Sequence, residues 1–93
     1  MKSLTLLLFL AVTPALAQMS PNSLVESGTI GDWWAADPVI RQQASGVLIK
    51  KVSGREDSEA AMALEKCISD ATQGKAELKT SKVIDIALSC EGG

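Results

Sequence analysis

Histidine and tyrosine are both absent from this 93-residue chain. Histidine is the side chain that most often transfers protons near neutral pH, and it is also the commonest metal ligand. Its absence excludes Ser-His-Asp and Cys-His catalytic arrangements. The sequence also has no C-x-x-C pair, glycine-rich phosphate loop or calcium-loop pattern. It therefore predicts a protein that is not an enzyme, with no catalytic residues, no metal site and no cofactor.

Long hydrophobic runs are absent as well. The longest apolar stretch, residues 4–12, is shorter than the roughly 20 residues that a membrane helix needs. It follows Lys2 and precedes a small-residue box that ends at Ala17, which is the pattern of a secretory signal peptide. We expect residues 1–17 to be cleaved, leaving a periplasmic or secreted protein without stable membrane insertion. The alternative is a retained N-terminal anchor.

The expected mature chain is short and mildly acidic. Removing 17 of the 93 residues leaves 76, with 8 basic against 11 acidic side chains, a net charge of −3. The residue after the expected cut is Gln18 and not cysteine, so the lipid-attachment residue of a bacterial lipoprotein is missing. The densest basic spot, Lys50-Lys51 with Arg55, is followed at once by acidic residues. This mixture is typical of a solvated surface and excludes the basic stripe that nucleic-acid binding needs.

Cysteine is scarce, and only Cys67 and Cys90 are present. Their wide spacing does not fit a zinc site or a redox pair. An exported chain reaches a compartment where disulfides persist, and a domain of this size buries little apolar surface. We therefore expect these two cysteines to form one structural, intramolecular disulfide.

Residues 18–36 are rich in serine, glycine, asparagine and proline and show no sustained periodicity. We expect an extended, loosely ordered N-terminal arm there. Near its end lie Trp33 and Trp34, the only aromatic residues left once Phe9 is removed. Neighbouring residues cannot share one helix or strand face, so at least one tryptophan is expected to pack on the protein body, while the other can lie at the surface. The pair either caps the core or forms a partner-binding motif, so both are candidate binding residues.

The first expected helix runs from Pro38 to about Val52, with Asp37 as its N-cap. Its apolar stripe consists of Ile40, Ala44, Val47, Leu48 and Val52. A glycine interrupts this helix, so a short strand over residues 46–49 is the alternative.

The second helix is the clearest element of the sequence. It is expected from Asp57 or Ser58 to about Gln73, with Gly74 after its end. Its apolar face consists of Ala60, Leu64, Cys67, Ile68 and Ala71.

A third helix is expected from Thr80 or Ser81 to about Cys90. The β-branched residues between positions 83 and 86 leave a strand as the alternative. The predicted fold class is all-α, a small three-helix domain over residues 37–93 that is closed by one disulfide and preceded by the arm.

These features favour surface recognition over chemistry. The leading hypothesis is a non-enzymatic exported protein, such as an inhibitor or immunity-type protein, that binds a protein partner through a helical surface. The alternatives are an acid-stress or holdase chaperone of the periplasm and a structural component of the cell envelope. In size, leader and cysteine number the chain is similar to small disulfide-linked helical periplasmic proteins, a resemblance that includes no shared motif.

Overall fold

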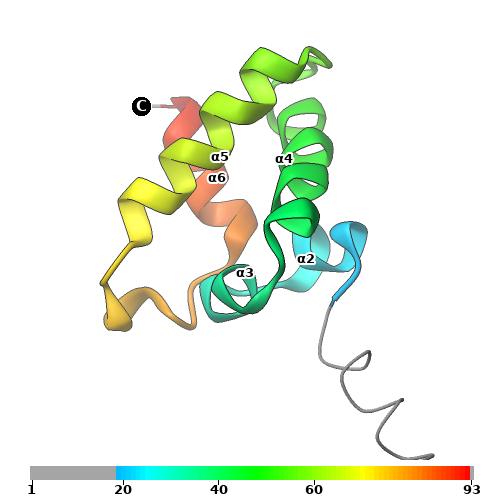
Figure 1. Cartoon of the computed structure of the whole chain (residues 1–93). Coiled ribbons are helices and arrows are strands. Elements are labelled where there is room, and N and C mark those ends of the chain that lie inside the picture. The colour runs from blue at the N-terminus through cyan, green and yellow to red at the C-terminus, as the bar shows by residue number, and fades with distance from the viewer. Residues whose placement is uncertain (1–18, 93) are drawn as a thin grey trace, which may run out of the picture.

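The computed structural model describes residues 19–92, and the expected signal peptide at residues 1–17 lies outside this range. The described part is all-α, as the sequence predicts, and contains no β-strand (Figure 1). Its elements are α2 (Pro21–Ser27), α3 (Ile30–Ala35), α4 (Pro38–Ser53), α5 (Ser58–Thr72), the 3-10 turn η2 (Ala76–Leu78) and α6 (Val83–Gly92).

The three long helices correspond to the three that the sequence predicts, although α6 begins at Val83, later than the start expected at Thr80 or Ser81. Asp37 is the N-cap residue of α4 and Pro38 its first helical residue, because proline tolerates the position that needs no amide donor. At α5, the Asp57 carboxylate accepts a hydrogen bond from the Ala60 backbone N–H at 3.1 Å. The alternative strands at residues 46–49 and 83–86 are wrong, since both segments are helical.

The turn between α4 and α5 begins at Gly54, whose φ of 77° lies in the left-handed region that favours glycine. In Figure 1, α4 and α5 meet at this turn, α6 lies behind α5, and α2 and α3 lie at the opposite end of α4. The contacts of α5 with both α4 and α6, and of α2 with both α4 and α6, enclose a single core.

The expected extended arm is the main difference between sequence and structure. Residues 21–27 and 30–35 form two short helices, α2 and α3. The Ser20 hydroxyl caps α2 by accepting from the Ser23 N–H at 3.1 Å. Thr29 and Asp32 form a reciprocal capping box at the start of α3. These local caps, together with burial of the apolar side chains between them, outweigh a composition that is typical of loops.

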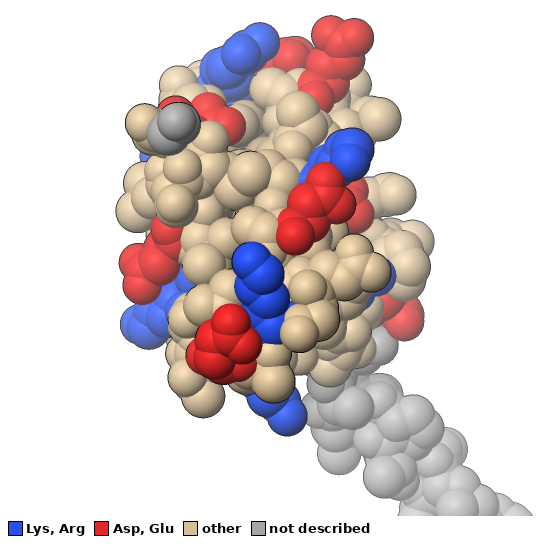
Figure 2. Space-filling view, turned by 90° about the vertical axis from the view of Figure 1, so that its left-hand side faces the viewer, with Lys and Arg blue, Asp and Glu red and all other residues tan. Residues whose placement is uncertain are grey.

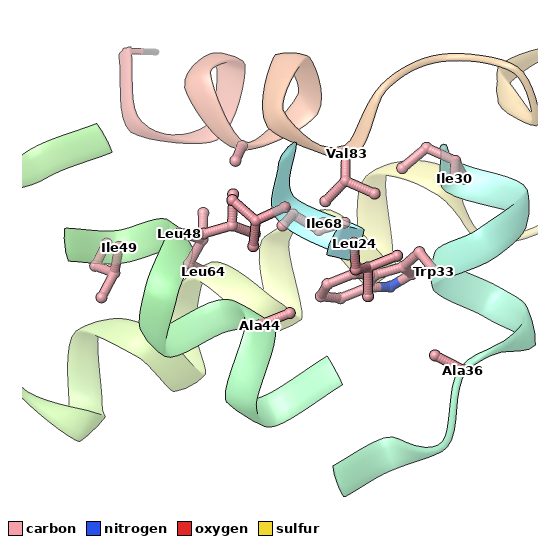
Figure 3. Packing of buried hydrophobic residues seen from close by; sticks show 12 residues of the cluster. Leu24, Ile30, Trp33, Ala36, Ala44, Leu48, Ile49, Leu64, Ile68 and Val83 are labelled. Carbon is pink, nitrogen blue, oxygen red and sulfur yellow. The ribbon is translucent and has the colours of Figure 1, made fainter. Parts of the chain in front are cut away.

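The core contains residues from both short helices as well as from the three long ones (Figure 3). Trp33 is its largest side chain and is fully buried beside Leu24. The complete set of buried hydrophobic residues is Leu24, Val25, Ile30, Trp33, Ala36, Ala44, Leu48, Ile49, Leu64, Ile68, Val83 and Ala87.

The buried face of α4 is rotated from the predicted stripe. Val47 is exposed, whereas Ser45 and Ile49 are buried, because α4 packs against three helices, α2, α5 and α6. The buried Ser45 hydroxyl donates to the Arg41 carbonyl at 2.8 Å, which satisfies its hydrogen-bonding capacity inside the core.

A similar rotation is seen in α5, where Thr72 is buried and Ala71 is exposed. The predicted disulfide is confirmed. Cys67 on α5 and Cys90 on α6 are bonded, with their Cα atoms 6.2 Å apart. None of the helices within residues 19–92 is both long enough and apolar enough to span a membrane.

Candidate functional site

The two tryptophans lie on different faces of α3, as the sequence predicts. Trp33 has 0% of its surface exposed and belongs to the core, whereas Trp34 is 41% exposed. Consecutive residues on an α-helix point about 100° apart, so one indole turns inward and the other outward. Of the two candidate binding residues, only Trp34 is accessible to a partner while the domain stays folded.

The exposed indole is tied to the end of α5. Its Nε1–H donates a hydrogen bond to the Thr72 hydroxyl at 3.0 Å. That hydroxyl in turn donates to the Ile68 carbonyl at 2.8 Å, and Thr72 is itself buried. The anchoring residue therefore has little freedom to move, and the edge of the Trp34 ring is fixed against a helix 38 positions away in sequence.

Arg41, on the first turns of α4, holds the ring from another direction. Its guanidinium carbon lies 5.4 Å from the centroid of the Trp34 ring, within the range of a cation–π contact. One guanidinium nitrogen donates to the carbonyls of Trp33 and Ala36, at 3.0 and 2.9 Å. Arg41 thus satisfies carbonyls at the end of α3 and also restricts the orientation of Trp34.

A cleft of about 400 Å³ opens beside Trp34. It lies between α3, the C-terminal end of α5 and the connection that follows α5, and its walls are largely apolar. Its lining includes Ile30, Gly31, Trp34, Thr72, Lys75 and Lys79. Gly74, with a φ of 72°, turns the chain at the end of α5, and the residues that follow it line the cleft.

Backbone hydrogen bonds join the start of α3 to the segment between η2 and α6, which includes Lys79 of the cleft lining. The Gly31 N–H donates to the Lys79 carbonyl at 2.9 Å, and the Ile30 N–H donates to the Ser81 carbonyl at 2.8 Å. A Cβ atom at Gly31 would lie only 3.0 Å from Lys79 Cγ. The absence of a side chain at Gly31 therefore lets the Lys79 stem lie close against α3.

Both charged residues in the lining are lysines. Neither Lys75 nor Lys79 takes part in an ion pair within residues 19–92, where the three ion pairs involve other basic residues. The acidic Glu77 stands between Lys75 and Lys79 in sequence, in η2, but does not line the cleft. Figure 2 views the side of the molecule on which the end of α5 and η2 lie, and it shows acidic and basic side chains interspersed, with neither sign gathered into a large patch. The charged residues that line the cleft are therefore both basic, in a chain whose net charge is −2.

A second hollow, of about 560 Å³, lies along α5 on the side that faces α4. Its lining includes Met62 together with Glu65 and Lys66, so that it offers both signs of charge and no fixed aromatic ring. The described residues contain no group of three or more acidic or cysteine side chains placed to hold a metal ion.

Sequence reasoning found Trp34 but missed its neighbours Arg41, Thr72, Lys75 and Lys79. They come from two segments, α4 and the continuous stretch of residues 72–79, and the packing of α3 on the end of α5 brings them to Trp34. No local pattern in the sequence reports that packing. Comparisons of the chain with protein-family models, curated proteins and solved structures gave no significant match.

Proposed function

We propose that this chain is a small exported protein that binds a protein partner through the cleft beside Trp34, without catalysing a reaction. One observation carries the proposal, namely the indole of Trp34, which is partly exposed and yet held by Thr72 and Arg41. Tryptophan is enriched among the residues that dominate binding energy, because it offers a large, rigid apolar surface.

The Trp34 ring is ordered before any partner binds, which favours tight binding. A side chain that is ordered before binding loses less conformational entropy when a partner arrives, and this cost is about 0.5–1.5 kcal/mol for a side chain with many rotamers. The hydrogen bond to Thr72 and the contact with Arg41 fix the ring in the free protein.

Export to the periplasm or the extracellular space is part of the proposal. It rests on the signal-peptide pattern of residues 1–17. The Cys67–Cys90 disulfide supports it, since such bonds persist in oxidising compartments and are rare in the cytosol.

The lack of buried acidic residues within residues 19–92 favours a binding protein over the acid-stress chaperone. A chaperone switched by acid would need carboxylates whose protonation releases the core. Among residues 19–92, the only buried polar or charged residues are Ser45 and Thr72, and none is acidic. Protonation of an exposed carboxylate changes the stability of the packed core less than protonation of a buried one.

The proposal is tested by identifying the partner and then measuring its affinity. Tagged mature protein is used to capture the partner from its own secretory compartment, and the purified pair is studied by calorimetry. We expect Trp34→Ala to raise the dissociation constant at least about tenfold, equivalent to about 1.4 kcal/mol. The matched control is Leu88→Ala, which shortens a 50% exposed side chain on α6, and we expect it to bind like the wild type. Equal affinity of the wild type and the Trp34 variant contradicts the proposal.

A further inference from the structure

We infer that the cleft beside Trp34 accepts an acidic segment of the partner, in which a bulky apolar side chain stands next to one or more carboxylates. This inference rests on the proposed function and specifies the chemistry of the bound segment. Two features of the cleft support it, namely the size of its apolar interior and the charge at its border.

The interior suits one large apolar side chain. Its volume is about 400 Å³, which lies near the lower end of the range of about 300–1,000 Å³ for ligand pockets. Trp34 and Ile30 are large apolar side chains of the lining, and the stem of Lys79 lies close against Gly31. An aromatic or leucine-sized side chain can stack on the fixed indole, whereas a whole helix or strand requires a longer groove.

The border supplies positive charge. Lys75 and Lys79 are exposed and line the cleft, and no acidic residue lines it. Neither ammonium group has an ion-pair partner within residues 19–92. Lysine side chains place their apolar stems along a cleft wall and their charged ends in solvent. Both ammonium groups can therefore meet carboxylates that flank a buried apolar side chain.

Arg41 is a positioning residue in this arrangement. Its guanidinium donates to the carbonyls of Trp33 and Ala36 and lies near the Trp34 ring. It is not among the residues that line the cleft. The charge selectivity of the cleft is thus assigned to Lys75 and Lys79.

Three short peptides test the inference by NMR on the oxidised mature protein labelled with nitrogen-15. The probes are acetylated and amidated Glu-Phe-Asp, its neutral counterpart Gln-Phe-Asn, and Glu-Ala-Asp, which lacks the bulky side chain. The Trp34 indole N–H reports on the cleft, and the buried Trp33 indole is an internal control. We expect Glu-Phe-Asp to shift the Trp34 signal and to bind at least about fivefold more tightly than Gln-Phe-Asn. Glu-Ala-Asp is expected to leave the signal unchanged.

A pair of double variants separates local charge from net charge. In Lys75→Gln/Lys79→Gln, the preference for the acidic peptide is expected to fall below about twofold. The control Lys50→Gln/Lys51→Gln removes the same charge at the end of α4 and is expected to keep the preference. Equal binding of the acidic and neutral peptides to the wild type, or an unchanged preference in the first variant, overturns the inference.

Measuring the affinity of the natural partner for each variant separates this inference from the proposed function. If the affinity of the partner depends on Trp34 but is unaffected by Lys75→Gln/Lys79→Gln, the binding function stands and the assigned chemistry is wrong. If the affinity depends on neither Trp34 nor the two lysines, both are wrong. Loss of affinity in both variants, with the control unaffected, supports both.

Discussion

Adjacent positions 33 and 34 carry the same residue type and have opposite environments. Trp33 completes the core, whereas Trp34 faces a cleft and is restrained by polar contacts. The helical rotation between consecutive residues accounts for the difference, and it is the reason why the sequence predicts different faces for the two indoles, with at least one packed on the protein body. It does not predict which is which, because that depends on the side of α3 that packs on the core.

The hydrogen bond between Trp34 and Thr72 gives the first prediction. Thr72→Val keeps the shape of the buried side chain but removes the acceptor for the indole N–H. We expect a loss of about 1 kcal/mol in the free energy of unfolding, together with faster exchange of the Trp34 indole proton with solvent. NMR exchange rates and urea unfolding measure the two effects.

Thr80→Val is the matched control for this prediction. Thr80 is exposed in the connection between η2 and α6, so its replacement is expected to change neither the stability nor the exchange rate of the indole proton. If Thr72→Val and Thr80→Val behave alike, Thr72 does not anchor the ring.

At the scale of elements, capping residues and glycines determine where helices begin and end. The sequence predicts α4 and α5 well, because periodic apolar residues lie between recognisable caps. It predicts the existence of α6 but places its start before the observed first residue, Val83. It fails for α2 and α3, which are too short to show a period. Their signals are the cap at Ser20 and the capping box of Thr29 and Asp32, and the composition of residues 18–36 obscures them.

Two glycines associated with α4 are expected to respond oppositely to alanine. Gly46 lies within the helix, and a Cβ there meets no atom within 4 Å. Gly46→Ala is therefore expected to stabilise the protein by up to about 1 kcal/mol. Gly54 has a φ of 77°, a conformation that is strained for alanine, so Gly54→Ala is expected to destabilise it by about 1 kcal/mol. Thermal unfolding of both variants provides the measurement, and shifts of the same sign would contradict the assigned backbone conformations.

The N-cap of α5 predicts a pH dependence. The hydrogen bond from the Ala60 amide, with help from Arg55, holds the pKa of the Asp57 carboxyl below its ordinary value. A lowered pKa in the folded state means that the charged form stabilises the fold above the unfolded pKa of about 3.9. This contribution is lost as the pH falls through the lower folded value.

We therefore expect the stability advantage of the wild type over Asp57→Ala to be constant near neutral pH and to shrink below about pH 4. Asp57→Asn is the control, because asparagine caps a helix without titrating, and its advantage over alanine is expected to stay constant. Urea unfolding at a series of pH values measures both differences. An advantage of the wild type that grows in acid contradicts this account.

At the scale of the whole molecule, a small core depends on one covalent link. The disulfide joins α5 to α6 across a sequence separation of 23 residues. On the chain-entropy model, it contributes roughly 3 kcal/mol by restricting the unfolded chain. We expect reduction, or Cys67→Ala/Cys90→Ala, to lower the free energy of unfolding by about this amount, as measured by urea unfolding. Unchanged stability after reduction contradicts a structural role for the bond.

The fold class and the disulfide can be predicted from sequence because they depend on local periodicity and on two cysteines. The cleft cannot, since Trp34, Thr72 and Lys79 meet only when α3 packs between the end of α5 and the connection to α6. Such contacts are set by tertiary packing. The sequence therefore predicts a binding protein in outline, and the geometry is the basis on which we propose the cleft beside Trp34 as the binding surface.

Site-specific photo-cross-linking in the living cell tests the central claim most directly. A photoreactive side chain replaces either Ala76, which lines the cleft, or the exposed Met62, which lies outside it on α5. The account predicts that position 76 gives a discrete cross-linked product with an exported protein, that Trp34→Ala removes this product, and that position 62 gives none. Cross-linking from position 62 alone, or a product at position 76 that persists without Trp34, would contradict the account.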